Sequence, residues 1–284
     1  MTRKMNWEPY LLLLPSFFYL IFFFGWPMLQ AFSLALRGED GGWTLAHIQR
    51  MVNDTFFREA VITTIALIVA ILPIQFLVAL AMALVVNARP RGAGLFLYFY
   101  AVPLAISDLA AGIVWFAIFT QRGYLNTILQ AIGLIEKPII FLNYQKPLWV
   151  LMAIVIAEVW RATAIIMVIL VAGLQSIPND YLEAAEIFGA GLFERVTQII
   201  LPLLRPSLQV ALILRTILAF QAFAVVVALA GQGATVLAKE AYKWYTDIRN
   251  PHVAAAYAGL IMVLSIATTV FYLRTLRTPE EVSL

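Results

Sequence analysis

Long uncharged apolar runs alternate with shorter polar segments along the chain, and the lengths of the apolar runs predict helices that cross a membrane. The first run carries no charge from Pro9 to Leu36, which is more than the roughly 20 helical residues that a hydrocarbon core requires. We therefore predict an all-α, polytopic membrane protein with about six spans. The predicted spans are residues 9–36, 60–87, 95–120, 147–175, 203–230 and 251–273.

The connections between these spans differ in length and composition. Residues 88–94 form a link so short that the second and third spans should be a tight antiparallel pair. Residues 121–146 are longer and partly apolar, which predicts a short interfacial helix before a loop. Because the number of predicted spans is even, both termini are expected on the same side of the membrane.

One polar connection, residues 179–202, reads NDYLEAAEIFGAGLFERVTQIILP. Asp180 is a candidate N-cap, and Glu183 completes a capping-box pattern. Gly189 suits the left-handed conformation that ends a helix. A second helix should run to Leu201, and Pro202 begins the next span. The pattern predicts a helix–turn–helix on the membrane surface, but by itself it is equally typical of an amphipathic loop without a partner.

Composition excludes several classes of protein. The 284 residues are 63% apolar and only 12% charged, with a mean hydropathy of +0.89, which excludes an ordinary soluble domain. The net charge is +3 and no basic run occurs, so no nucleic-acid partner is expected. The chain has no cysteine and no metal-ligand spacing, which excludes disulfides and thiol catalysis. The first run is too long for a removable signal peptide, so we expect it to be retained as a span.

Four ionisable residues fall within or near the predicted spans, where an unpaired charge is costly. Glu158 and Arg161 are three residues apart on one helix and are able to pair. They are either a self-neutralising pair near one end of the fourth span or part of a polar pathway. Asp108 either pairs with Arg161 or Arg215, or lies near an interface, and the sequence does not choose among these alternatives.

The motifs of residues 179–202 resemble those of a known family. Glu183-Ala184-Ala185, then Gly189-Ala190, then Ile199-Ile200-Leu201-Pro202 are similar to the EAA loop of permease subunits in ATP-binding-cassette importers. The flanking spans extend the resemblance to the carbohydrate branch, of the maltose or trehalose type. The segments that carry this second resemblance are residues 103–115, 123–126, 160–163 and 172–178.

Two positions depart from the family pattern. Phe188 stands where the family usually has aspartate, and Val196 stands where it usually has phenylalanine. An aspartate at the first position is able to cap the second helix, whereas a phenylalanine is not. Either another group supplies this cap, or Phe188 is an additional apolar contact with a partner.

The resemblance implies that the loop is a coupling helix seated in a cleft of a separate ATPase subunit, with Glu183 paired to a basic residue there. The implied coupling residues are Glu183, Ala184, Ala185, Phe188, Gly189 and Phe193. The sequence contains no G-x-x-x-x-G-K-[ST] phosphate loop. We therefore expect ATP and magnesium at the partner subunits, no cofactor bound by this chain, and no enzymatic activity of its own.

The resemblance also implies an assembly in the lipid bilayer. Its expected members are a second homologous permease, two ATPase subunits and an external solute-binding protein. This chain would form half of the translocation pathway for a mono-, di- or oligosaccharide and would couple ATP hydrolysis to alternating access. The expected location is the inner membrane of a bacterial or archaeal cell, with the coupling helix and both termini in the cytoplasm. The distribution of lysine and arginine does not decide this orientation by itself.

A sugar pathway needs neutral hydrogen-bonding groups and aromatic rings on which the sugar stacks. Gln75 and Gln221 are helix-borne amides, although buried amides more often bond to neighbouring helices. Phe220 is a candidate ring, although membrane aromatics are more often packing or lipid-facing residues. The candidate pathway residues are Asp108, Glu158, Arg161, Gln75, Gln221 and Phe220.

Three alternatives compete with a sugar importer. The first is an importer permease for another solute, such as glycerol phosphate. The second is a secondary transporter, which would show an internal repeat with midplane acids, but the two halves of this sequence show no clear similarity. The third is a membrane-embedded enzyme, which would need a cluster of catalytic carboxylates or histidines, and the sequence contains no convincing cluster of this kind.

Overall fold

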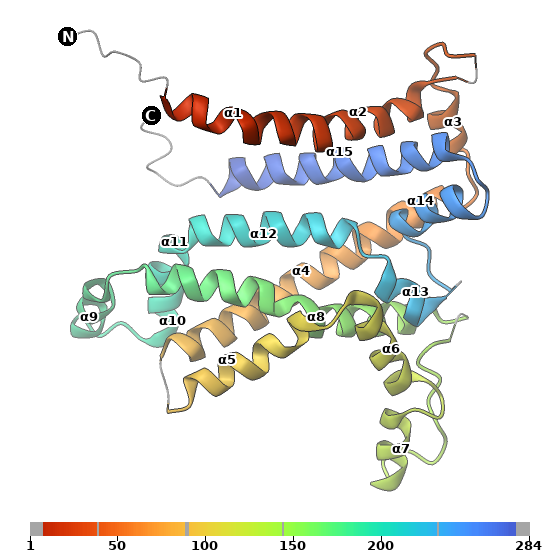
Figure 1. Cartoon of the computed structure of the whole chain (residues 1–284). Coiled ribbons are helices and arrows are strands. Elements are labelled where there is room, and N and C mark those ends of the chain that lie inside the picture. Colours follow the sequence, from red (N-terminus) through yellow and green to blue (C-terminus); the bar gives the residue numbers. More distant parts are fainter. Residues whose placement is uncertain (1–7, 39, 89–90, 144, 232, 277–284) are drawn as a thin grey trace, which may run out of the picture. The chain divides into compact units, whose positions relative to one another are not determined.

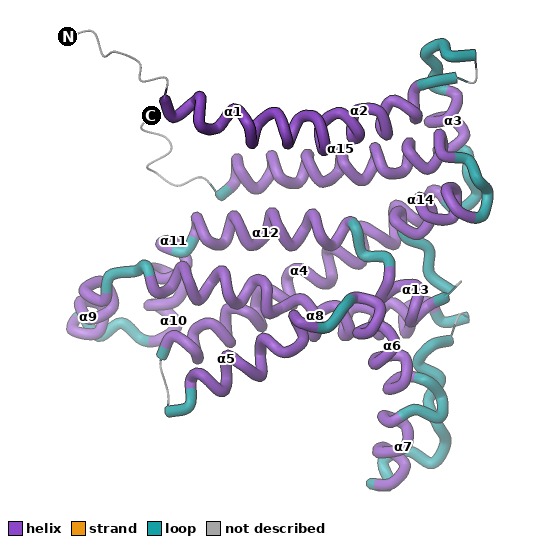
Figure 2. Tube along the Cα trace, in the orientation of Figure 1, coloured by secondary structure: helices purple, strands orange, loops and turns teal. Residues whose placement is uncertain are grey.

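Helices joined by turns and loops make up this chain, as described by a computed structural model for residues 8–38, 40–88, 91–143, 145–231 and 233–276 (Figures 1 and 2). No strand occurs among these residues, which confirms the predicted all-α fold. Residues 1–7 and 277–284, for which the resemblance implies a cytoplasmic location, lie outside the described part of the chain.

Four helical segments are long and apolar enough to cross a membrane: Leu11–Leu36, Phe57–Asn87, Pro147–Gln175 and Pro251–Thr275. Two pairs of helices meet the same condition only when each bent pair is taken as one span. They are Ala93–Ala105 with Asp108–Ala131, bent by 100°, and Leu192–Leu203 with Arg205–Phe220, bent by 74°. The described residues therefore provide four to six membrane helices, in agreement with the predicted polytopic class.

The chain divides into two compact units, and the first comprises the described residues of Met1–Phe57 and Glu240–Leu260. Its elements are α1 (Glu8–Leu20), η1 (Ile21–Gly25), α2 (Trp26–Ser33), η2 (Leu34–Leu36), α3 (Ala46–Val52), most of α14 (Leu237–Thr246) and the first part of α15 (Pro251–Thr275). Asp54 connects its parts, because one carboxylate oxygen accepts hydrogen bonds from Trp244 Nε1 at 2.7 Å and from Tyr257 OH at 3.1 Å.

The second unit comprises the described residues of Arg58–Lys239 and Ile261–Leu284. Its elements, besides the remaining parts of α14 and α15, are α4 (Phe57–Asn87), α5 (Ala93–Ala101), η3 (Val102–Ala105), α6 (Asp108–Phe119), α7 (Tyr124–Ala131), α8 (Pro147–Gln175), α9 (Asn179–Ile187), α10 (Leu192–Glu194), η4 (Arg195–Ile200), α11 (Leu201–Leu203), α12 (Arg205–Phe220) and α13 (Ala224–Ala230). Within this unit, α9 and α10 lie at one end of the long helices α4, α8 and α12, and α6 and α7 lie toward the other end (Figure 1).

Helix α8 carries the core of the second unit, and the core has two parts along it. In the N-terminal half, Val150 and Ile154 share an apolar cluster with Val226 of α13. In the C-terminal half, Leu170 shares another cluster with Ala79 of α4. The buried residues of α8 in the first cluster end at position 157, and those in the second cluster begin at position 164. Polar residues of α8 therefore lie between two apolar layers.

The predicted span at residues 95–120 is not one straight helix. Pro103 lies in η3, where its ring removes a backbone donor and prevents the regular helix from continuing. Ser107 then adopts an extended conformation, and its Oγ accepts a hydrogen bond from the Ala110 N–H at 3.3 Å. This side chain is an N-cap that starts α6 in a new direction.

The predicted span at residues 203–230 is also divided, because α12 ends at Phe220 and α13 begins at Ala224. Neither glycine nor proline occurs at this break, so tertiary contacts have to hold it. Helix α13 packs so closely on α6 that a Cβ added to Gly112 would lie 2.6 Å from the Cβ of Ala228. The Nζ of Lys239 donates to the Gly231 carbonyl at 2.7 Å and stabilises the carbonyl end of α13.

Candidate functional site

Arg161 is the central residue of α8, because fourteen residues of this helix precede it (147–160) and fourteen follow it (162–175). Glu158 lies one turn earlier, and its two carboxylate oxygens accept hydrogen bonds from Arg161 Nη2 at 3.3 and 3.0 Å. The predicted pairing of these residues is confirmed. The interpretation that placed the pair near one end of the span is wrong, because the pair lies at the middle of the helix.

Arg215 of α12 and Gln75 of α4 enclose the same carboxylate. Arg215 donates from Nη2 to Glu158 Oε2 at 2.7 Å and from Nε to Gln75 Oε1 at 2.7 Å. Gln75 donates from Nε2 to the main-chain oxygen of Glu158 at 2.8 Å. Each of these three residues is at most 1% exposed. Gln75 therefore bonds to neighbouring helices, as buried amides usually do, and is closed off from solvent.

Asp108 completes this group and is the member at its surface. It is the first residue of α6, and its Oδ1 lies 2.7 Å from Arg161 Nη1. Of the partners that the sequence left open for Asp108, the structure selects Arg161. The side chain of Asp108 is 51% exposed, whereas that of Arg161 is 14% exposed. We call Gln75, Asp108, Glu158, Arg161 and Arg215 the central polar network.

The charges of the central polar network balance, with two carboxylates against two guanidinium groups. A buried charge without a partner is destabilising, and here each charge has at least one partner of opposite sign. Arg161 Nε and Arg215 Nη1 are nevertheless buried without a hydrogen-bond partner among the described residues. The network joins α4, α6, α8 and α12 at one level, so it fixes the register of these four helices.

The other two candidate pathway residues lie apart from this network. Phe220 is buried near the end of α12 and lines an apolar cavity of about 430 Å³ with residues of α4 and α15, among them Leu72 and Leu264. Gln221 is exposed in the break between α12 and α13. The structure therefore brings four of the six candidate pathway residues together and leaves these two outside.

The second candidate region is residues 179–202, which we call the coupling loop. Its first helix, α9, begins at Asn179, and no side chain caps its start. The predicted capping box of Asp180 and Glu183 is therefore wrong. Pro178 occupies the N-cap position, so Asp180 lies within the first helical turn and not before it. There its charge still favours the helix start through the helix dipole.

The predicted end of α9 is confirmed. Gly189 has a φ of +76°, which is the left-handed conformation that favours glycine. The Gly189 N–H donates to the Glu186 carbonyl at 3.0 Å, and the Ala190 N–H donates to the Ala185 carbonyl at 2.9 Å. These two bonds form a Schellman motif. The reversal of the chain after α9 is therefore fixed by backbone hydrogen bonds.

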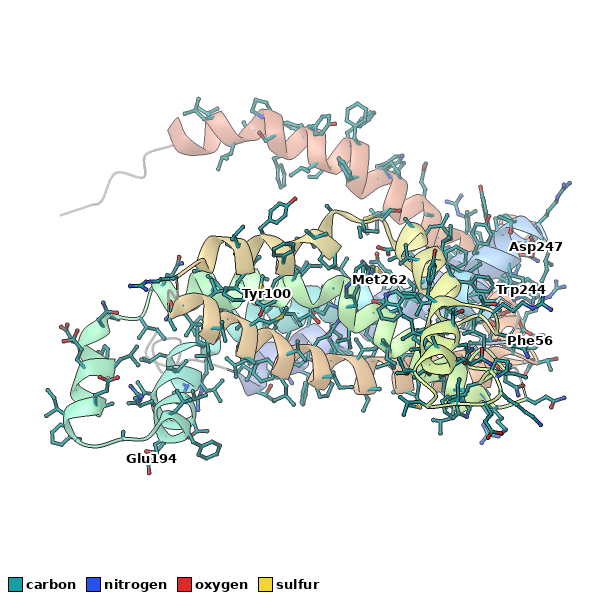
Figure 3. The ribbon with its side chains drawn as sticks, turned by 90° about the horizontal axis from the view of Figure 1, so that it is seen from below. Phe56, Tyr100, Glu194, Trp244, Asp247 and Met262 are labelled. Atoms are coloured by element: carbon teal, nitrogen blue, oxygen red, sulfur yellow. The ribbon has the colours of Figure 1, made fainter. Side chains whose placement is uncertain are left out.

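Glu194 supplies a cap for the second helical part of the coupling loop. The Gly191 N–H donates to Glu194 Oε2 at 2.9 Å. Another group therefore supplies the cap that Phe188 is unable to provide, which is the first of the two alternatives that the sequence left open. Glu194 lies in the part of the second unit that carries α9 and α10 (Figure 3). The carboxylate of Glu186 on α9 also pairs with the guanidinium group of Arg195. The two halves of the loop are therefore tied together.

Apolar side chains of the coupling loop face outward. Phe188 is 89% exposed and Phe193 is 79% exposed, and Ile187 and Leu192 are also exposed. Such a group of large exposed apolar residues is typical of a contact surface. Ala185 is the exception among the implied coupling residues, because it is buried within the chain. Glu183, Ala184 and Gly189 are exposed with the two phenylalanines.

Sequence reasoning did not place one feature of the central polar network, the partner of Arg215. Arg215 was noted as an ionisable residue, but its bond to Glu158 joins positions far apart in the sequence. The available signal was that an arginine in an apolar run requires a buried acid.

Comparisons with known proteins place the whole of both regions in one family. The family described as "Binding-protein-dependent transport system inner membrane component" matches residues 75–279. The matched range includes the central polar network and the coupling loop.

Relatives of nearly the same length share this similarity. The chain is 31% identical to the trehalose/maltose transport system permease protein MalF of Thermococcus litoralis, over 96% of each chain. It is 30% identical to the sn-glycerol-3-phosphate transport system permease protein UgpA of Agrobacterium fabrum, over 94% of this chain and 93% of that protein. Among solved structures, a chain of a bacterial alginate ABC transporter in complex with an alginate pentasaccharide-bound periplasmic protein has a TM-score of 0.76 at 21% identity, covering 95% of this chain and 94% of that one. This last likeness shows the fold.

Proposed function

Since this chain belongs to the family of binding-protein-dependent transport system inner membrane components, we propose that it forms half of the translocation pathway of an ATP-driven sugar importer. A second, similar permease supplies the other half. Two ATPase subunits drive the cycle, and an external solute-binding protein delivers the sugar. ATP and magnesium act at the ATPase subunits, because this sequence lacks the phosphate loop that would hold them.

The observation that carries the proposal is the outward-facing apolar surface of the coupling loop. Phe188 and Phe193 are among the most exposed large apolar residues of the described chain, and their burial in a partner would contribute about 1.5–3 kcal/mol per side chain. A loop stiffened by a Schellman motif and by the Glu186–Arg195 ion pair is suited to transmit a displacement of a bound subunit to the membrane helices. We infer that an ATPase subunit covers this surface, with Glu183 paired to a basic residue of that subunit.

The orientation follows from this assignment. An ATPase works in the cytoplasm, so the coupling loop faces the cytoplasm, and the six spans that the sequence predicts would place both termini there as well. The central polar network then lies near the middle of the bilayer. There we assign Asp108 and Arg161 to the pathway side and Glu158 to the support behind them.

Sugar is favoured as the solute by the trehalose/maltose name of a relative that matches nearly the whole chain. A second candidate solute is glycerol phosphate, because a relative of that name has almost the same identity. Uptake by the complete importer, measured in competition with a panel of mono- and disaccharides and with sn-glycerol 3-phosphate, separates the two candidates. Competition by glycerol phosphate alone would contradict the sugar assignment.

The test of coupling compares two variants of the loop in the complete importer. We expect Glu183→Lys and Gly189→Pro to leave folding and insertion intact but to separate ATP hydrolysis from sugar uptake. Lysine would repel the basic residue of the ATPase subunit, and proline is unable to adopt the φ of +76° at position 189. The measurement is the ratio of sugar molecules transported to ATP hydrolysed in proteoliposomes.

Matched controls lie in the loop after α7. Gly133 has a φ of +71°, and the backbone bonds that follow α7 resemble those that follow α9, so Gly133→Pro reproduces the backbone change outside the coupling loop. Glu136→Lys reproduces the charge change at an exposed position. Both controls should keep the wild-type ratio of transport to hydrolysis. A normal ratio in assembled Glu183→Lys and Gly189→Pro importers would disprove the coupling role of the loop.

A further inference from the structure

Asp108 differs from the other charged members of the central polar network in its exposure. Its side chain is 51% exposed, against 14% for Arg161 and at most 1% for Glu158 and Arg215. Its carboxylate nevertheless contacts Arg161, the central residue of α8. At 1.5 Å per residue, that position is about 21 Å from either end of the helix. Asp108 is therefore an exposed anion at the level of the middle of a membrane-spanning helix.

An exposed carboxylate at this depth has to face water or another protein. A charge in contact with lipid tails is strongly disfavoured, and ionisable residues within membrane spans accordingly face cavities or partners. In an importer of the proposed kind, the pathway lies between this chain and the second permease. Asp108 therefore belongs to the wall of the pathway, with Arg161 directly behind it.

Asp108 decides which charge this wall presents. With Asp108, the network has two guanidinium groups and two carboxylates and a net charge of zero. Without its carboxylate, Arg161 and Arg215 would face Glu158 alone, which leaves a net charge of +1. Arg161 Nη2 would stay bonded to Glu158, and Arg161 Nη1, which now pairs with Asp108, would become available from the pathway side.

We propose that Asp108 is a specificity-determining residue that masks Arg161, so that the pathway admits uncharged polyhydroxylated solutes and does not hold anionic ones. The proposal rests on the proposed function and deepens it by assigning the charge class of the solute. Guanidinium groups bind carboxylates and phosphates in the same geometry. Asp108 therefore occupies the place on Arg161 that the phosphate of an anionic solute would take.

The test uses two sugars that differ by one phosphate, trehalose and trehalose 6-phosphate. Equilibrium binding of each radiolabelled sugar is measured on the assembled permease–ATPase complex in nanodiscs, without the external binding protein. We expect Asp108→Asn to strengthen binding of trehalose 6-phosphate at least about tenfold, because a freed guanidinium makes charge-assisted bonds to phosphate. Binding of trehalose is measured beside it, and the ratio of the two affinities is the result. An unchanged ratio of the two affinities would overturn the proposal.

Further variants separate masking of Arg161 from a general loss of structure. Asp108→Glu keeps the negative charge and should keep the wild-type ratio of affinities. In the double variant Asp108→Asn with Arg161→Gln, the gain for trehalose 6-phosphate should disappear, because the guanidinium that binds it is absent. A gain that persists in the double variant contradicts the proposal. Asp108→Ser makes the same charge change in a second way, and failure of both Asn and Ser variants to assemble would make Asp108 structural and contradict the proposal.

Sugar uptake by the wild-type importer tests the proposed function separately. If the complete wild-type importer takes up no sugar, the proposed function fails, whatever the variant at position 108 does. If it takes up trehalose or maltose but Asp108→Asn gains no affinity for the phosphorylated sugar, only the assignment of Asp108 fails.

Discussion

The central polar network and the coupling loop each place side chains where they are destabilising by themselves, but the network buries charged groups and the loop exposes apolar ones. The network buries charged groups, with Arg215 and Glu158 closed off from solvent at the middle of the helical bundle. The loop exposes apolar groups, with Phe188 and Phe193 on its outer face. Each arrangement is destabilising unless a partner compensates it, whether the group is a buried charge or an exposed aromatic side chain.

The difference between the two regions lies in where the compensating partner is found. The network is nearly self-sufficient, because its cations and anions balance within one chain. The loop has good internal hydrogen bonds but leaves its apolar face open, and in the proposed function another chain covers this face. The network should therefore respond to mutation through stability, and the loop should respond through assembly.

The largest expected effect comes from breaking the balance of charge inside the network. Glu158→Ala leaves Arg215 and Arg161 with one carboxylate between them, and we expect a loss of about 3–5 kcal/mol in stability, because an unpaired buried charge remains. The thermal unfolding midpoint of the detergent-solubilised chain measures this loss.

A paired substitution sharpens this result. Glu158→Leu with Arg215→Leu removes both charges and leaves Arg161 with Asp108. Replacing a buried ion pair by apolar side chains is often neutral, so the double variant should unfold at a higher temperature than either single variant. If the double variant is as unstable as the sum of the two single variants, the balance of charge is not what stabilises the network.

An intermediate effect is expected when the apolar face of the loop is changed. Phe188→Ser should leave the thermal stability of the isolated chain unchanged, since the side chain is exposed in it. Binding to the ATPase subunit should weaken about tenfold to a hundredfold, which corresponds to the loss of one buried phenylalanine. Tyr124→Ser on α7 removes another exposed aromatic ring and should not weaken this binding. Equal binding of the ATPase subunit by wild type and Phe188→Ser would refute an interface at Phe188.

The smallest expected effect concerns the internal cap of the loop. Glu194→Ala removes the acceptor of the Gly191 N–H, and loss of a helix cap costs about 1 kcal/mol. Faster amide hydrogen exchange over residues 191–200 should report this local loss. Glu183→Ala, an exposed glutamate in the same loop without a capping role in the structure, serves as the control and should leave exchange unchanged.

Local patterns predicted the parts of both regions that depend on neighbours in the sequence. The pairing of Glu158 with Arg161 follows from helix periodicity alone, and the turn at Gly189 follows from backbone sterics. The partner of Asp108 was not predictable, because it depends on the 100° bend that follows Pro103. The break near Gln221 was also missed, since it contains no helix-breaking residue and is held by the packing of α13 on α6.

The start of α9 was predicted wrongly for a local reason. The pattern of Asp180 and Glu183 matches a capping box, but Pro178 takes the N-cap position and shifts the helix start. A proline is compatible with a helix start because its fixed φ suits that position. Pro178, two residues before Asp180, is therefore the signal in the sequence for the observed helix start.

The bend between Leu203 and Arg205 connects the coupling loop to α12, which carries a member of the central polar network. Leu204, at the 74° elbow, is fully buried and fixes the pivot. On one side of the pivot lies the stiffened coupling loop, and on the other side α12 carries Arg215 about 15 Å further along its axis. If a partner displaces the coupling loop as proposed, we expect the displacement to reach, along α12, the arginine that holds the Glu158 carboxylate.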